Sequence, residues 1–226
     1  MYMSRVRIKL CENSLQYLDG LAKKDVYAVH QLLWNLFPSD PDAKRDFLFR
    51  AEQKDGWPTY YVLSKRSPVQ VSELFSVETK PFAPNITNGQ QFAFDLRVNP
   101  VVAKRADGKK NCVHHDVWMD AKHKAKLANY SEADTDRLIT ESVIKWIVDR
   151  SEQNGFKIDI QQLFIGAYQQ HRAIKKNNSA LRYSTVDYKG VLTVVDSVKL
   201  KDALGSGIGR AKAFGCGLLL IKPYST

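Results

Sequence analysis

Cysteine is scarce in this sequence. The three cysteines, Cys11, Cys112 and Cys216, are far apart and odd in number, which argues against a disulfide framework and favours reduced thiols in the cytoplasm. No apolar run is long enough to cross a bilayer. The first ten residues lack the apolar core of a secretory signal peptide. We therefore expect a cytoplasmic protein with no membrane partner.

Acidic residues are also too few to balance the basic ones. The chain has 34 lysines and arginines against 24 aspartates and glutamates, which gives a formal charge of +10 and a pI near 9.4. Such an excess favours a polyanionic partner. The apolar fraction of 44% is ordinary for a globular protein, and 226 residues suit one domain or two small ones.

The first half of the chain predicts a β-α-β-β-(α)-β order. Residues 2–10 alternate, with Arg5, Arg7 and Lys9 on one face and no acid among them. This pattern indicates a strand with a basic face toward a polyanion, although an ordinary solvated face is the alternative. The further elements expected are a helix over 25–37, a hairpin of strands from 47 and over 59–64 turning at Asp55-Gly56, an ambiguous segment over 68–75, and a closing strand over 77–82.

The second half repeats this order. Prolines and Gly89 suggest a boundary, so we expect domains over 1–88 and 89–226. The elements expected are strand 92–98, a basic turn at Asp107-Gly108, basic helix 118–127, helix 134–154 with Leu138, Val143, Ile144, Ile147 and Val148 as its apolar stripe, strand 156–168, a polar basic loop over 169–178, strands 181–188 and 191–195 interrupted at Gly190, a helix from its cap Ser197 to Leu204, and strand 216–221. The whole predicts an α+β fold of two tandem ferredoxin-like halves, the second with an insertion after its first strand.

One histidine lies on the helix expected over 25–37. Tyr27, His30 and Trp34 share a face beside its apolar stripe, with His30 at the border. We therefore expect the imidazole to be neither fully buried nor freely solvated. From the helix alone, a histidine that merely packs is the simpler interpretation.

Glycines are concentrated near the end of the chain. Five of the twelve fall within thirteen residues, at Gly205, Gly207, Gly209, Gly215 and Gly217. One interpretation places their backbone amides against a phosphate, with a helix beginning near Gly209. The other is a helix–strand connection that needs several turns. The spacing matches neither a P-loop nor a convincing dinucleotide fingerprint.

A second cluster raises the question of a metal site. Its residues are Cys112, His114, His115, Asp116, Asp120 and His123. The ligand types suit zinc or iron, but the spacing fits no known template and no second ligand group is evident. We therefore expect no metal and no cofactor.

Four segments together resemble a known family. They are Tyr27–Pro38, Arg45–Arg50, Leu96–Pro100 and the glycine-rich Gly205–Leu219. They are similar to the CRISPR RNA-processing endoribonucleases of the CasE branch, which mature guide RNA for Cascade, and the similarity spans essentially the whole chain. The resemblance implies two ferredoxin-like halves and a catalytic histidine on the first helix, supported by a tyrosine one turn earlier. Those positions are His30 and Tyr27 here.

The resemblance also implies a substrate and a reaction. A CRISPR repeat stem-loop is cut at its 3′ base by its own 2′-hydroxyl, leaving a 2′,3′-cyclic phosphate and a 5′-hydroxyl, and other Cascade subunits are partners. Shape and phosphates should dominate recognition of an A-form stem. We expect RNA contacts from two basic loops and the glycine-rich segment, namely Lys104, Arg105, Lys109, Lys110, Arg172, Lys175, Lys176, Arg182, Gly207, Gly209, Arg210 and Lys212. The alternatives are a non-catalytic RNA-binding module and a metal-dependent nuclease built on residues 114–123.

Overall fold

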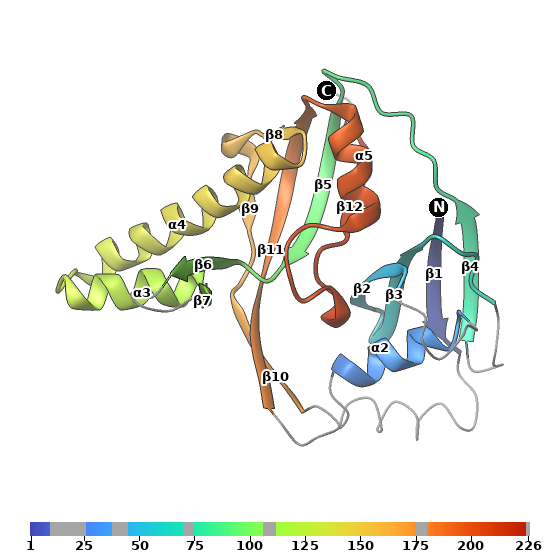
Figure 1. Ribbon diagram of the computed structural model, residues 1–226, viewed down its shortest axis with the longest axis horizontal. Helices are drawn as coiled ribbons and strands as arrows, with labels where there is room; N and C mark the ends of the chain where they lie inside the picture. Colours follow the sequence, from blue (N-terminus) through green and yellow to red (C-terminus); the bar gives the residue numbers. More distant parts are fainter. Residues whose placement is uncertain (10–25, 38–44, 70–74, 106–111, 175–179, 225–226) are drawn as a thin grey trace.

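The computed structural model describes residues 1–9, 26–37, 45–69, 75–105, 112–174 and 180–224 (Figure 1). In the described residues of the first half, one helix packs against a four-stranded antiparallel sheet. The elements are β1 (Tyr2–Ile8), α2 (Val26–Trp34), β2 (Phe47–Lys54), β3 (Trp57–Ser64) and β4 (Phe75–Pro81). The strand order β2-β3-β1-β4 is that of a ferredoxin-like fold, as predicted.

Local sequence explains the first sheet. Asp55 and Gly56 both have positive φ, 52° and 79°, as the tight turn between β2 and β3 requires. Leu33 of α2 and Phe37, three residues beyond its end, pack with Phe47 and Phe49 of β2 in one buried cluster. The helix therefore covers the sheet with its apolar side and leaves His30 at the margin.

An acid from the neighbouring strand meets the basic face of β1, which favours the alternative of an ordinary solvated face. Glu78 of β4 places its carboxylate oxygens 2.5 Å from the Nη2 atoms of both Arg5 and Arg7. The two strands are adjacent and antiparallel, and Arg5 lies directly opposite Glu78. The acid was missing from the strand itself but is supplied by its neighbour in the sheet.

The second half repeats the same arrangement on a longer sheet. Its strands are β5 (Gln91–Val98), β8 (Phe156–Ile158), β9 (Phe164–Ile165), β10 (Gln169–Ile174), β11 (Ala180–Val194) and β12 (Leu219–Pro223). The order is β10-β11-β5-β12, with β8 and β9 also paired to β11. Helices α4 (Glu132–Gln153) and α5 (Ser197–Ser206) contribute Trp146, Ile147 and Leu200 to its core. Two tandem ferredoxin-like halves are thus confirmed, while the exact boundary at residue 88 stays a prediction.

The insertion after the first strand of this half is confirmed too. It is a small hairpin of β6 (Val101–Arg105) and β7 (Cys112–Asp116), followed by α3 (Val117–Leu127). α3 packs along α4, at the left of Figure 1. α4 contacts both α3 and the sheet, so its buried residues are not confined to one narrow stripe. They are Ile139, Val143, Trp146, Ile147 and Ser151. The predicted stripe was therefore only partly correct.

Four local predictions were wrong. The segment expected as a polar loop begins with β10, because its backbone pairs with β11 in register, Gln169 opposite Thr185. The strand expected over 156–168 is broken by a 3-10 turn, η1 (Ile160–Gln162). β11 runs through Gly190 without interruption. The glycine there leaves room for the Gln162 carbonyl oxygen, which would lie 2.7 Å from a Cβ. α5 is capped by Asp196, whose carboxylate accepts from the backbone N–H groups of Val198 and Lys199, rather than by Ser197.

The two sheets are joined by apolar contacts. Leu48 and Leu63 of the first sheet form a buried cluster with Leu218, which precedes β12. Within the described residues, no helix is both long enough and apolar enough to cross a membrane.

Candidate functional site

His30 lies in α2 and is partly exposed, as predicted. Its ring stacks on Phe47 of β2 at 5.7 Å between centroids and lies 5.8 Å from the ring of Trp34. Burial lowers the pKa of the imidazole, and the positive charge of Arg45 lowers it further. His30 is therefore neutral at neutral pH and able to accept a proton.

Arg45 was not among the sequence-predicted site residues. It lies two residues before the strand β2 that packs under His30, and burial lowers the pKa of its guanidinium. Its Nη1 atom is buried without a hydrogen-bond partner among the described residues. The only sequence signal for Arg45 was its place at the start of the segment 45–50.

Lys212 belongs to the same neighbourhood. It opens η2 (Lys212–Phe214), a short 3-10 turn that packs against both α2 and β2. Burial lowers the pKa of its ammonium group, as does the charge of Arg45. Its Nζ donates to the Ser206 carbonyl oxygen at 2.7 Å. The charge of Arg45 thus acts on both the imidazole and Lys212, and two partly buried cations near each other are an arrangement that a phosphate would stabilise.

Tyr27 lies on α2 one turn before His30. Its side chain is outside the described part of the structure, so its supporting role stays a prediction.

The glycine-rich segment is a series of tight turns. Gly207, Gly209, Gly215 and Gly217 all have positive φ, and no helix begins at Gly209. Gly207 ends α5 with φ 77° and ψ 155°, a region open essentially to glycine alone. A Cβ on Gly207 would lie 2.9 Å from the Leu48 side chain. This packing supports the interpretation as a helix–strand connection, while RNA contact at Gly207 and Gly209 stays a prediction.

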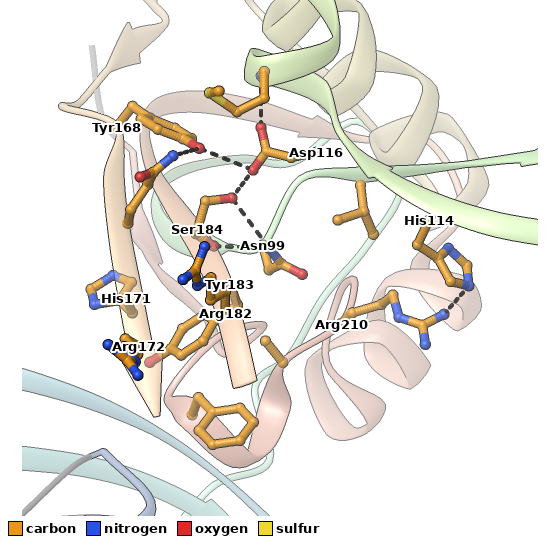
Figure 2. A pocket seen from close by; sticks show the side chains of 15 residues that line it. Asn99, His114, Asp116, Tyr168, His171, Arg172, Arg182, Tyr183, Ser184 and Arg210 are labelled. Carbon is orange, nitrogen blue, oxygen red and sulfur yellow. Dashed lines mark hydrogen bonds between the residues drawn. The ribbon is translucent and has the colours of Figure 1, made fainter. Parts of the chain in front are cut away.

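Those predicted RNA-binding side chains that the structure describes are spread over several elements, and Arg172, Arg182 and Arg210 line one hollow. Lys109, Lys110, Lys175 and Lys176 lie outside the described residues. Lys104 donates to Asp120 of α3, and Arg105 is exposed at the end of β6. Arg172 and Arg182 lie directly opposite each other on β10 and β11. Arg210 points toward His114, whose Nε2 is 2.8 Å from its Nη1 (Figure 2).

The residues considered for metal binding have separate structural roles. Asp116 caps α3, accepting from the backbone N–H of Met119. Asp120 pairs with Lys104 and Lys124, and His114 contacts Arg210. Among the described residues, no group of three or more His, Cys, Asp or Glu side chains has a geometry that could hold a metal ion.

Known proteins resemble this chain over most of its length. A family model described as CRISPR associated protein matches residues 1–223. The CRISPR system Cascade subunit CasE of Escherichia coli strain K12 is 31% identical over 204 residues, which cover 88% of this chain and 93% of CasE. The CRISPR-associated endoribonuclease Cse3 of Thermus thermophilus is 28% identical over 153 residues, which cover 64% of this chain and 61% of Cse3.

The three-dimensional likeness agrees with the sequence match. The structure of Thermus thermophilus Cse3 bound to an RNA representing a pre-cleavage complex superposes with a TM-score of 0.68 at 25% identity, covering 99% of this chain and 100% of that one. The chain therefore belongs to the CRISPR-associated protein family that includes CasE of Escherichia coli.

Proposed function

We propose that this protein is an endoribonuclease that cuts CRISPR precursor RNA at the 3′ base of the repeat stem-loop. The observation that carries the proposal is the placement of Arg45 beside His30, a neutral and partly buried imidazole, with Lys212 on a turn that packs against the same helix. A group that exchanges protons near neutral pH next to preorganised positive charge is what cleavage of a phosphodiester requires. The related Cse3 is named as an endoribonuclease, which supports the same assignment.

The reaction draws its nucleophile from the substrate. The RNA 2′-hydroxyl oxygen forms a bond to the adjacent phosphorus, and the bond from phosphorus to the 5′-oxygen breaks. The hydroxyl proton leaves as the oxygen attacks, and the departing oxygen takes up a proton. The products are a 2′,3′-cyclic phosphate and a 5′-hydroxyl end, and the steps use neither a metal ion nor a protein nucleophile.

His30 carries the proton transfer in this scheme. Its lowered pKa keeps a lone pair available at neutral pH for the 2′-hydroxyl proton. Arg45 and Lys212 stabilise the charge that builds on the phosphorane oxygens, and the buried Nη1 of Arg45 is a donor that the protein leaves unused among the described residues. Tyr27 positions the nucleotide or donates a hydrogen bond.

In this proposal the basic β10–β11 hairpin contacts the RNA stem. Arg172 and Arg182 are both exposed and carry like charge directly across from each other, an arrangement that costs stability unless an anion lies between or beside them. Lys175 and Lys176 follow in the connecting segment. The basic residues at positions 104–110 form the second contact. CasE is a Cascade subunit, and we propose that this protein likewise stays in a Cascade complex with its product.

The test is cleavage of a labelled repeat stem-loop in the presence of a chelator. The proposal predicts one cut at the 3′ base of the stem that is insensitive to chelator. The downstream product should accept phosphate from polynucleotide kinase directly, because it carries a 5′-hydroxyl. Chelator-sensitive cleavage would instead favour a metal-dependent nuclease, and binding without cleavage would favour a non-catalytic RNA-binding module.

A further inference from the structure

A hollow separate from His30 lies beside the β10–β11 hairpin. Its volume is about 690 Å³, and its walls come from β7, β10, β11 and the glycine-rich segment (Figure 2). This size is typical of sites for small organic molecules. An isolated bridge between Asn99 and Arg210 holds the glycine-rich segment against the end of β5, so the wall that carries Arg210 is tied to the sheet.

The hollow is positively charged. Arg172, Arg182 and Arg210 line it, and Asp116 is its one carboxylate. Asp116 is already used, since it accepts from the Ser184 hydroxyl and from the backbone N–H of Met119. Among the described residues, no carboxylate forms an ion pair with Arg172 or Arg182. A bound phosphate would satisfy both guanidinium groups.

A row of aromatic rings forms another wall. The ring of Tyr183 stacks on His171, with centroids 4.8 Å apart and planes 20° apart. On its other side Tyr183 stacks on Phe214, at 5.0 Å and 28°. Each of the three residues is partly exposed. Stacked rings beside cations are what proteins use to bind unpaired nucleotides.

The inner end of the hollow carries an ordered polar network. Asn99 donates through Nδ2 to the Ser184 carbonyl oxygen at 2.9 Å, and Gln170 donates to the Tyr168 hydroxyl at 3.1 Å. The Tyr168 hydroxyl donates in turn to Asp116 at 3.3 Å. Figure 2 shows this network above Arg172, Arg182 and Tyr183. Fixed amide, hydroxyl and carboxylate groups of this kind suit the polar edge of a base.

The hollow lies next to the proposed cleavage site. Phe214, which ends the aromatic row, belongs to the same 3-10 turn as Lys212. That turn packs against α2, the helix of His30. An RNA strand that leaves the hollow across this turn would therefore reach the cleavage site directly.

We propose that the hollow binds one unpaired nucleotide of the substrate RNA, adjacent to the cleaved linkage. The base stacks on an end of the aromatic row, which Tyr183 holds together between His171 and Phe214. The phosphate that joins this nucleotide to the stem lies between Arg172 and Arg182, so the two arginines act at the junction of stem and flank. The inference rests on the proposed function, because it takes the ligand to be part of the cleaved strand. A free mononucleotide has the same chemistry and is the other source that the test must separate.

The test compares two stem-loops whose scissile 2′-hydroxyl is replaced by hydrogen. One ends flush at the base of its stem, and the other keeps unpaired nucleotides beside the cut. The wild-type protein should bind the flanked RNA about five-fold to a hundred-fold more tightly, the range expected for one stacked base. Tyr183→Leu should lose that preference and bind the flush RNA as the wild type does, whereas Tyr183→Phe, which keeps the ring, should retain it.

The outcomes separate this inference from the proposed function. A wild-type protein that binds both RNAs equally, or a Tyr183→Leu protein that weakens both by the same factor, would overturn the nucleotide site alone. Failure to bind even the flush stem-loop would contradict the proposed function as well. Adenosine monophosphate should compete with the flanked RNA only weakly. If it competes tightly, and the protein binds the flanked and the flush RNA equally well, the hollow is a site for free nucleotides instead.

A fluorescence measurement on the wild-type protein is independent of how the variants fold. With 2-aminopurine as the unpaired nucleotide beside the cut, binding should quench its emission, because the base becomes stacked. The same probe placed in the apical loop should not be quenched. Equal emission changes at both positions would overturn the proposal.

Discussion

The Nη2 atom of Arg50 on β2 lies 2.9 Å from Oδ1 of Asp95 on β5, and this ion pair links the two sheets. The Arg50 side chain is only 2% exposed, and the same Nη2 lies 3.5 Å from Asp187 of β11. Asp187 also accepts two hydrogen bonds of 2.7 Å from Arg97. Burial raises the pKa of Asp187, but the hydrogen bonds from Arg97 and the charge of Arg50 outweigh it and hold the pKa below its usual range.

Replacing Arg50 should therefore weaken the joint between the two halves. We expect Arg50→Met to lower the free energy of unfolding by about 1 to 3 kcal/mol, less than for a fully buried pair, because Asp95 and Asp187 keep other partners. Thermal or urea unfolding measures the change. Arg5→Met is the matched control, since the Arg5–Glu78 pair is exposed and should contribute less than about 1 kcal/mol. Equal effects of the two substitutions would contradict this account.

The glycine at the end of α5 should be needed for folding. Gly207→Ala should cost about 2 to 5 kcal/mol, because it combines a backbone region that only glycine adopts with an overlap on Leu48. Gly89→Ala is the control, since Gly89 also has positive φ but its Cβ would meet nothing within 4 Å; it should cost about 1 to 2 kcal/mol. A Gly207→Ala protein that melts like the wild type but binds RNA poorly would instead assign this glycine to RNA contact.

Arg45 should tune the titration of His30. The positive charge of Arg45 lowers the pKa of His30, so Arg45→Gln should raise that pKa toward its usual value. If His30 is the base, cleavage falls as pH drops through its pKa, and this acid limb should move to higher pH in Arg45→Gln. Arg45→Lys keeps the charge and should leave the limb near its wild-type position. Rate–pH profiles under single-turnover conditions measure the shift, and identical limbs in wild type and Arg45→Gln would rule out the coupling.

The β10–β11 hairpin should contribute salt-dependent affinity. Each phosphate contact removed should flatten the slope of log K against log salt by about 0.7 to 1. We therefore expect the double variant Arg172→Gln with Arg182→Gln to bind the stem-loop more weakly. Its salt slope should be flatter by up to the amount expected for two lost phosphate contacts. The double change Lys175→Ala with Lys176→Ala should act in the same direction. Lys199→Gln is the control. Helix α5, which carries Lys199, lies at the opposite end of this half from β10 in Figure 1, so this variant removes a charge without touching the hairpin and should leave the slope unchanged.

Much of the fold could be predicted because local patterns agree with it. The alternation over Phe92, Phe94, Leu96 and Val98 predicted β5, and all four are buried in the structure. The hairpin turn at Asp55-Gly56 was equally clear. The polar segment that forms β10 could not be found in this way, because its strand conformation comes from pairing with β11 rather than from its own residues.

The candidate site could be predicted only in part. The position of His30 at the border of an apolar helix face was visible in the sequence and is confirmed. Arg45 and Lys212 are far apart in the chain, and the electrostatic coupling between them depends on how η2 packs against α2 and β2. The acid Glu78 opposite Arg5 was missed for the same reason, since it is contributed by a neighbouring strand.

The most direct test of the account is the cleavage rate of His30→Ala. Removal of a positioned acid–base group typically slows a reaction about 10² to 10⁴-fold, while a neutral imidazole adds little affinity for phosphate. We expect His30→Ala to cut a labelled repeat stem-loop that much more slowly under single-turnover conditions with chelator, yet to bind the stem-loop almost as tightly as the wild type. Tyr27→Phe should lose less, because it keeps the ring. The substrate with hydrogen in place of the scissile 2′-hydroxyl should bind and remain uncut. A wild-type rate for His30→Ala, or cleavage of that deoxy substrate, would contradict the proposed mechanism.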